Sequence, residues 1–99
     1  MEASSVSRLN AVIHERARLG IMSVLAARAA ATFTELKSLL DMTDGNLSVH
    51  LRFLEKAGYV TVEKRFIDRK PQTMLKMSRK GRIAFEHYVS VLEEIVKKR

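Results

Sequence analysis

The sequence predicts a small, mainly helical domain with one β-hairpin in its second half. Long stretches of helical apolar spacing, one short alternating stretch and few helix-breaking residues support this prediction. The chain has 99 residues, of which 46% are hydrophobic and 29% are charged, so it has the size and composition of one globular domain. It contains one Pro, four Gly and no Cys, which excludes disulfides and thiolate metal sites. We expect residues 1–99 to form a single domain.

Two helices are expected in the first part of the chain. Apolar residues at helical spacing predict a helix over residues 9–29. A second helix is expected over residues 35–40, where Thr34 is a plausible N-cap. Thr32 is the alternative, because with Glu35 it would form a capping box. The sequence therefore leaves two positions for the start of the second helix, which differ by two residues.

A third helix is expected over residues 44–57, with Thr43 as its N-cap and Gly58 as its left-handed stop. Its buried stripe follows a spacing of i, i+4 and i+7. The stripe consists of Leu47, Leu51 and Leu54. Two short helices separated by a three-residue turn form a helix-turn-helix arrangement.

The residue pattern changes from helical spacing to alternation after the third helix. Residues 60–67 alternate in the way that favours a strand, and residues 73–77 continue as a second strand. The polar stretch 68–72, which contains the only proline, is expected to be the connecting loop. A very short extended piece at residues 32–33 is also compatible with the sequence. The pair of strands predicts a hairpin with a basic tip.

The last helix is expected over residues 79–97, with Ser78 as its N-cap. It has two apolar stripes, which together are wider than one small core requires. A homodimer built from the first and last helices would bury the excess, whereas the alternative is that the monomer core absorbs both stripes. The expected interface residues are Leu9, Val12, Leu19, Tyr88, Val91, Leu92 and Ile95.

The net positive charge of the chain lies in one stretch. Residues 52–82 hold ten basic and three acidic side chains and therefore carry the whole net charge of +7. A localised basic stretch of this kind indicates a polyanionic partner. The alternative is a solvated basic face that keeps the protein soluble.

Two sequence segments, residues 46–60 and 73–82, together with the order of three helices, a hairpin and a last helix, are the features by which the chain resembles the ArsR and MarR families of prokaryotic transcriptional regulators. Residues 46–60 resemble their recognition-helix signature, with Ser48, His50 and Leu51 followed by an Ala-Gly pair and a valine. Residues 73–82 resemble the end of their second wing strand and the start of the last helix. The resemblance implies a winged helix-turn-helix fold that binds DNA.

The chain departs from the metal sensors of the ArsR family. Those sensors often carry a Cys-x-Cys pair in the helix before the recognition helix, whereas residues 35–40 offer no thiolate here. A second type of site uses carboxylates and histidines on the last helix, where this chain has His87 followed by the non-ligand Ser90. We therefore expect no metal and no cofactor, and an effector stays unidentified.

The free face of the third helix is expected to enter the major groove, because it lies opposite the leucine stripe. The expected contacts there are Asp44, Gly45, Asn46, Ser48, Val49, His50 and Arg52. Ser48 and His50 follow from the resemblance, and packing is an equal alternative for His50. Phe53 is expected to pack under the wing. The wing and its flank, at about residues 64–73, are expected to contact the backbone or the minor groove through Lys64, Arg65, Arg69, Lys70, Gln72 and Thr73.

These observations predict a sequence-specific regulator that binds double-stranded DNA as a homodimer, and repression is the expected mode. The alternative is an architectural or protein-interaction winged-helix module that reads no bases. An enzyme is not expected, because the sequence has no Gly-rich phosphate loop and its three histidines are scattered. Without a signal peptide or an apolar run of about 20 residues, the expected location is the cytoplasm.

Overall fold

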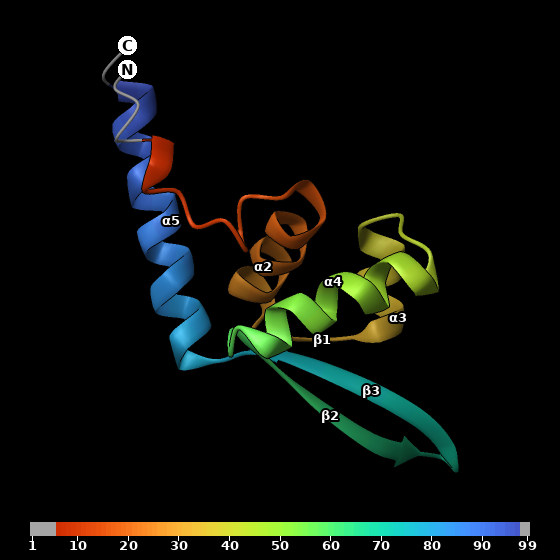
Figure 1. Ribbon diagram of the computed structural model, residues 1–99. Coiled ribbons are helices and arrows are strands. Elements are labelled where there is room, and N and C mark those ends of the chain that lie inside the picture. The colour runs from red at the N-terminus through yellow and green to blue at the C-terminus, as the bar shows by residue number, and fades with distance from the viewer. Residues whose placement is uncertain (1–5, 98–99) are drawn as a thin grey trace.

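The computed structural model describes residues 6–97 as four main helices and a three-stranded antiparallel sheet (Figure 1). The mainly helical winged arrangement predicted from the sequence is confirmed. The ends of the predicted domain, residues 1–5 and 98–99, lie outside the described residues. The elements in chain order are α2 (Arg16–Arg28), β1 (Ala30–Thr32), α3 (Phe33–Leu39), α4 (Asp44–Lys56), β2 (Val60–Ile67), β3 (Lys70–Met77) and α5 (Arg79–Lys97).

Helix α2 begins later in the chain than the apolar spacing predicts. The side chain of Asn10 accepts hydrogen bonds from the backbone N–H groups of Val12 (2.9 Å) and Ile13 (3.1 Å). Such local bonds give the backbone an alternative to the helix. Glu15 then acts as the N-cap, since its carboxylate accepts a bond from the Arg18 N–H at 2.9 Å. The predicted helix start was therefore wrong, because short-range polar contacts outweigh the apolar pattern.

Helix α3 is capped by Thr32, the alternative that the sequence left open. The Thr32 hydroxyl accepts from the Glu35 N–H at 3.0 Å, and the Glu35 carboxylate accepts from the Thr32 N–H at 2.8 Å. The hydrogen bonds with Thr32 are the largest cause that holds the pKa of Glu35 below its usual value. A hydrogen bond that Arg28 donates to the Glu35 carboxylate lowers the pKa further. The short extended piece is β1, which ends at the cap residue Thr32 and pairs with residues 74–76 of β3. It begins two residues earlier than the predicted 32–33, because Phe33 already belongs to α3.

The hairpin has a shorter connection than the predicted loop of residues 68–72. Asp68 and Arg69 form a two-residue turn with φ of 50° and 66°, the conformation that matches strand twist in hairpins. Lys70 and Pro71 already belong to β3, which pairs with β2 up to Lys70. The loop prediction was wrong there, because β1 ends before this part of β3 and leaves a free strand edge, where proline is tolerated.

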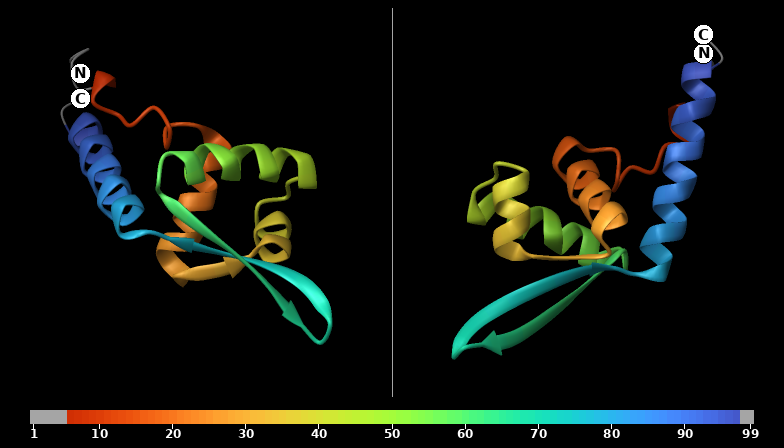
Figure 2. Two further views of the ribbon diagram at one scale, coloured as in Figure 1. Left: turned by 60° about the horizontal axis from the view of Figure 1, so that its bottom comes forward. Right: turned by 180° about the vertical axis from the view of Figure 1, so that it is seen from behind.

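The core lies between the helices and the inner half of the sheet, and the hairpin extends away from it (Figure 2). Its buried side chains are Ile13, Ile21, Met22, Leu25, Ala31, Leu36, Leu47, Leu51, Leu54, Val60, Leu75 and Tyr88. Ser78 caps α5 as predicted, accepting from the Gly81 N–H at 2.9 Å and donating to the Gly58 carbonyl at 2.6 Å. Gly81 has no room for a side chain, because a Cβ there would clash with the backbone carbonyl oxygen of Tyr59.

The first described residues, from Val6 onward, lie beside α5, where Arg8 pairs with Glu94 at 2.8 Å (Figure 1). His14 Nδ1 lies 2.7 Å from the hydroxyl of Tyr88. Tyr88 and Val91, two of the expected interface residues, are each 1% exposed and pack internally in the single chain. Burial also raises the pKa of Tyr88.

The other expected interface residues differ in exposure. Leu9, Val12 and Leu19 are half-buried and pack against the core, and Ile95 is also half-buried. Leu92 is exposed. Within residues 6–97, no helix combines the length and the apolar character needed to cross a membrane.

Candidate nucleic-acid interface

Helix α4 is held firmly in place, as the sequence predicts. Thr43 caps it by accepting a bond from the Asn46 N–H at 3.2 Å. Asp44, in its first turn, pairs with Lys37 of α3 at 2.8 Å. The three leucines of the predicted stripe are buried. Because this stripe fixes the rotation of the helix, the opposite face is turned outward.

The outward face of α4 mixes apolar and basic side chains. Val49 and Phe53 are 45% and 53% exposed, and Arg52 and Lys56 beside them are exposed too. The predicted packing of Phe53 under the wing is wrong, because its ring instead receives the guanidinium of Arg18 from α2, 4.6 Å from its centre. The face therefore offers cations and apolar surface together.

Gly45 lies in the first turn of α4 with open space beside it. A Cβ built there would meet nothing within 4 Å beyond its own neighbours and helix backbone, and Gly45 does not have a positive φ. Neither packing nor a tight turn within the described residues requires glycine at this position. A glycine in a helix costs about 1 kcal/mol relative to alanine, so the absence of a side chain here is unexplained by the chain itself.

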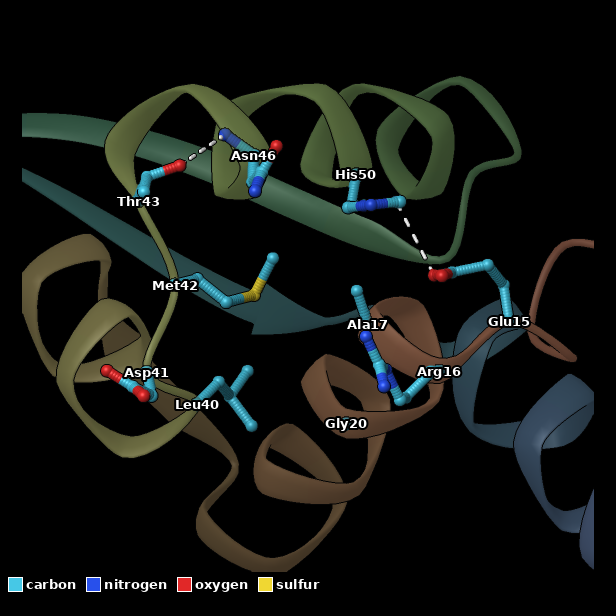
Figure 3. A pocket seen from close by; sticks show the side chains of 10 residues that line it. All are labelled: Glu15, Arg16, Ala17, Gly20, Leu40, Asp41, Met42, Thr43, Asn46 and His50. Carbon is cyan, nitrogen blue, oxygen red and sulfur yellow. Dashed lines mark hydrogen bonds and ion pairs between the residues drawn. The ribbon is translucent and has the colours of Figure 1, made fainter.

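His50 turns toward α2 rather than straight outward. Its Nδ1 lies 3.5 Å from a carboxylate oxygen of Glu15 and 3.4 Å from the Arg18 guanidinium (Figure 3 shows the contact with Glu15). Partial burial raises the pKa of Glu15, but backbone hydrogen bonds from Arg18 and Ala17 and the nearby His50 outweigh it, so the net pKa lies below the usual value. The His50 ring thus lies against Glu15 and Arg18 at the start of α2.

An open hollow of about 520 Å³ lies between α2, the turn after α3 and the first turns of α4 (Figure 3). It is lined by Glu15, Arg16, Ala17, Gly20, Leu40, Asp41, Met42, Thr43, Asn46 and His50. Asn46 and His50 therefore share one side of α4, whereas Val49 and Arg52 belong to the outward face. The predicted contact residues of this helix do not form one continuous row.

A second hollow, of about 280 Å³, brings the recognition helix and the wing together. Ser48 and Arg52 of α4 line it with Lys64 and Thr73 of the hairpin. These four residues were all predicted as contacts, although they lie far apart in the sequence. Their common position is the part of the predicted interface in which the two elements meet.

The outer part of the wing carries the remaining predicted contacts. Lys64, Arg65, Arg69 and Lys70 are exposed. Gln72 is half-buried and accepts a hydrogen bond from Arg65 Nε at 3.1 Å, so it positions that arginine. One neighbour of these cations, Phe66, was not predicted from the sequence. It is 75% exposed. Its alternation with Lys64 could have indicated the shared face of the strand.

Metal binding finds no support in the described part of the chain, where no group of three His, Asp or Glu side chains is arranged to hold an ion. The basic residues Arg79, Lys80 and Arg82 lie at the start of α5 and are exposed, except that the ammonium of Lys80 lies 5.9 Å from the centre of the Tyr59 ring. The cations of the interface therefore lie both on the wing and at the base of α5.

Comparison with known proteins assigns the fold to a family. The model of the winged helix DNA-binding domain matches residues 17–96. An uncharacterized protein of Methanocaldococcus jannaschii is 36% identical over 80 residues, which cover 81% of this chain and 87% of the relative. The structure of a transcriptional regulator homologue from Pyrococcus horikoshii OT3 matches with a TM-score of 0.90 and 30% identity over 96% of both chains.

A more distant structure, YusO from Bacillus subtilis, shares the fold, with a TM-score of 0.80 and 16% identity over 96% of this chain and 64% of its own. The outward face of α4 and the basic wing are both features expected of a DNA-binding domain, in agreement with the family match. The chain belongs to the winged helix DNA-binding domain family, and it is a DNA-binding transcriptional regulator.

Proposed function

We propose that the protein recognises specific sequences of double-stranded DNA as a homodimer, with α4 in the major groove and the wing on the adjacent backbone or minor groove. The observation that carries this proposal is the outward face of α4, which combines Val49, Arg52 and a glycine that the fold does not require. A helix fits the major groove of B-DNA, and its first residues usually approach the bases.

The residue types on α4 suit base recognition. Arg52 is able to donate two hydrogen bonds to guanine, Asn46 suits adenine, and the Val49 side chain suits the methyl group of thymine. Gly45 leaves the N–H groups at the start of α4 accessible to a phosphate, which helix N-termini favour. The start of α4 would thus contact the backbone, whereas Asn46, Val49 and Arg52 would contact bases.

The surface of α5 supports the homodimer. Phe85, Val89, Leu92 and Val96 recur at a spacing of i, i+4, i+7 and i+11. Val89 and Leu92 are each 36% exposed, and Val96 is 50% exposed. An apolar seam of this kind on a small domain is most simply buried against the same seam of a second copy. Two-fold symmetry would then place two α4 helices about one DNA turn apart.

The test of specificity is selection of bound fragments from a randomised pool of duplex DNA. The wild-type chain is expected to enrich a near-palindromic site, and Asn46→Ala and Arg52→Ala are expected to relax the preference at one or two positions each. Arg28→Ala, an exposed arginine outside α4 and the wing, is the charge-matched control and keeps the wild-type preference. Uniform weak binding to all fragments would reject sequence specificity and favour an architectural role.

The test of the homodimer is light scattering at micromolar concentration. The wild-type chain is expected at twice the monomer mass. Leu92→Glu places a charge in the seam and is expected to give a folded monomer, whereas Glu86→Lys on the same helix changes a charge outside the seam and keeps the dimer. A wild-type monomer would contradict this part of the proposal.

A further inference from the structure

We infer that Phe66, at the tip of the wing, is an apolar wedge that enters the minor groove of bound DNA and kinks the duplex. This inference rests on the proposed function, since it requires α4 to be docked in the neighbouring major groove. Phe66 would insert at a base-pair step. Neither the packing of the fold nor base recognition by α4 requires this side chain.

The position of Phe66 in the fold does not account for its side chain. Phe66 is 75% exposed, the largest exposed fraction among the large apolar side chains of residues 6–97. Its cross-strand partner is Pro71, and that neighbour leaves three quarters of the ring uncovered. A phenylalanine left in water forgoes about 1.5–3 kcal/mol of burial, so the ring contributes little to the stability of the isolated chain.

The strand pattern places Phe66 on the face that continues toward α4. Side chains alternate between the two faces of a strand, so Phe66 shares its face with Lys64 and Val62. Val62 and Lys64 line the hollow shared with α4. The other face carries Arg65 and Ile67 instead. Phe66 is therefore the outermost apolar side chain on the face that the predicted DNA would meet.

The reach of the hairpin fits the next groove. Phe66 lies four positions beyond Val62 along β2, which at about 3.3 Å per residue amounts to about 13 Å of strand. The major groove of B-DNA is about 12 Å wide. Because Val62 lies in the hollow shared with α4, a ring this far along the strand would reach across the phosphate backbone that borders the major groove, toward the adjacent minor groove.

Charge identifies DNA as the occupant rather than an apolar protein surface. Lys64, Arg65, Arg69 and Lys70 lie within four positions of Phe66 along the chain and are all exposed. The turn at Asp68 and Arg69 and the hydrogen bond from Arg65 to Gln72 give the tip a defined geometry. Cations that neutralise phosphates on both sides of an apolar ring are the arrangement by which proteins unstack and bend DNA from the minor groove.

The test measures the shape of the bound DNA separately from binding. A duplex selected by the wild-type chain is labelled at its ends for energy transfer, and a second copy carries 2-aminopurine at steps beside the α4 site. We expect the wild-type chain to bend the duplex by about 20–90° and to raise the 2-aminopurine signal at one step. Phe66→Ala is expected to lose most of both signals and to bind no more than about tenfold more weakly, because the cost of unstacking is lost with the ring.

Two further variants make the result decisive. Phe66→Leu keeps an apolar wedge and is expected to retain most of the bend, whereas Ile67→Ala, on the opposite face of the strand, leaves bend and affinity unchanged. A wild-type complex with straight DNA, or equal bending by wild type and Phe66→Ala, would overturn the wedge and leave the proposed function intact. A wild-type chain that binds no duplex would overturn the proposed function itself, and the wedge with it.

Discussion

The recognition helix and the wing meet in one hollow, but the chain holds them in different ways. Helix α4 is fixed by its buried leucines, by the ion pair between Lys37 and Asp44, and by the contact of His50 with Glu15. The wing beyond Lys64 extends away from the core and is held by its strand ladder and by the bond from Arg65 to Gln72. One element is positioned by the core and the other by its own backbone.

Their charges differ as well. Residues 44–51 contain one acidic and no basic side chain, if His50 is neutral, whereas residues 64–70 contain four basic and one acidic side chain. Phosphate contacts provide affinity without sequence information, and base contacts provide the sequence information. We therefore predict that specificity comes mainly from α4 and affinity mainly from the wing, and mutations can separate the two contributions.

The largest expected effect is the loss of affinity when the wing is neutralised. Replacement of Lys64, Arg65, Arg69 and Lys70 by Gln removes four cations, so the slope of log K against log salt is expected to become shallower by about 3–4. Binding at low salt is expected to fall more than about a hundredfold for all sequences alike. Titration of preferred and random duplexes over a salt series measures both quantities, with Arg28→Gln as control. A loss confined to the preferred duplex would contradict the assignment.

A smaller effect is expected from Arg52→Lys in α4, because it keeps the charge and removes the bidentate geometry. Discrimination at one base pair is expected to fall by about tenfold, since a good bidentate contact is worth about 1–3 kcal/mol. The salt slope is expected to stay at the wild-type value. Competition between duplexes that differ at single positions measures the change. Equal weakening on every duplex would show instead that Arg52 contacts phosphate.

Gly45→Ala is expected to move stability and binding in opposite directions. The added methyl group meets open space and favours the helix, so the free energy of unfolding is expected to rise by up to about 1 kcal/mol. The same methyl group would lie between the start of α4 and DNA, so affinity is expected to fall several-fold. Urea unfolding and duplex titration measure the two effects. Unchanged affinity would remove Gly45 from the interface.

The sequence predicts the parts of this molecule that depend on periodic apolar patterns and strong caps. The leucine stripe of α4 fixes which face is free, and Thr43, Gly58 and Ser78 act at its ends and at the start of α5 as their residue types predict. Local hydrogen bonds are harder to predict, because Asn10 competes with the helix over a few residues only. The outcome depends on geometry that no apolar count contains.

The sequence predicted the residues of the candidate site better than it predicted which of them lie together in the fold. The basic wing and the α4 face follow from charge and spacing, but the contact between His50 and Glu15 joins different elements and is set by tertiary packing. The internal burial of Tyr88 likewise depends on tertiary packing, since its hydroxyl lies 2.7 Å from Nδ1 of His14 in the segment before α2. An apolar stripe shows that a surface is covered, but the sequence does not specify whether the same chain or a second copy covers it.

The smallest expected effect concerns the contact that holds α4 and has no counterpart in the wing. The pKa of Glu15 lies below its usual 4.5 in the folded chain, so its interactions stabilise the fold above pH 4.5 and are lost as the pH falls through 4.5 toward the folded value. Glu15→Gln is expected to flatten the acid side of the stability curve.

Urea unfolding at a series of pH values from neutral to acidic measures this change. Glu86→Gln, which removes an exposed carboxylate of α5, is the matched control and is expected to keep the wild-type dependence. If Glu15→Gln loses as much stability on acidification as the wild type does, the charge of Glu15 stabilises the fold neither through its cap at the start of α2 nor through its contact with His50 of α4. The difference between a core-fixed helix and a self-supporting wing would then rest on the leucines and the pair of Lys37 and Asp44 alone.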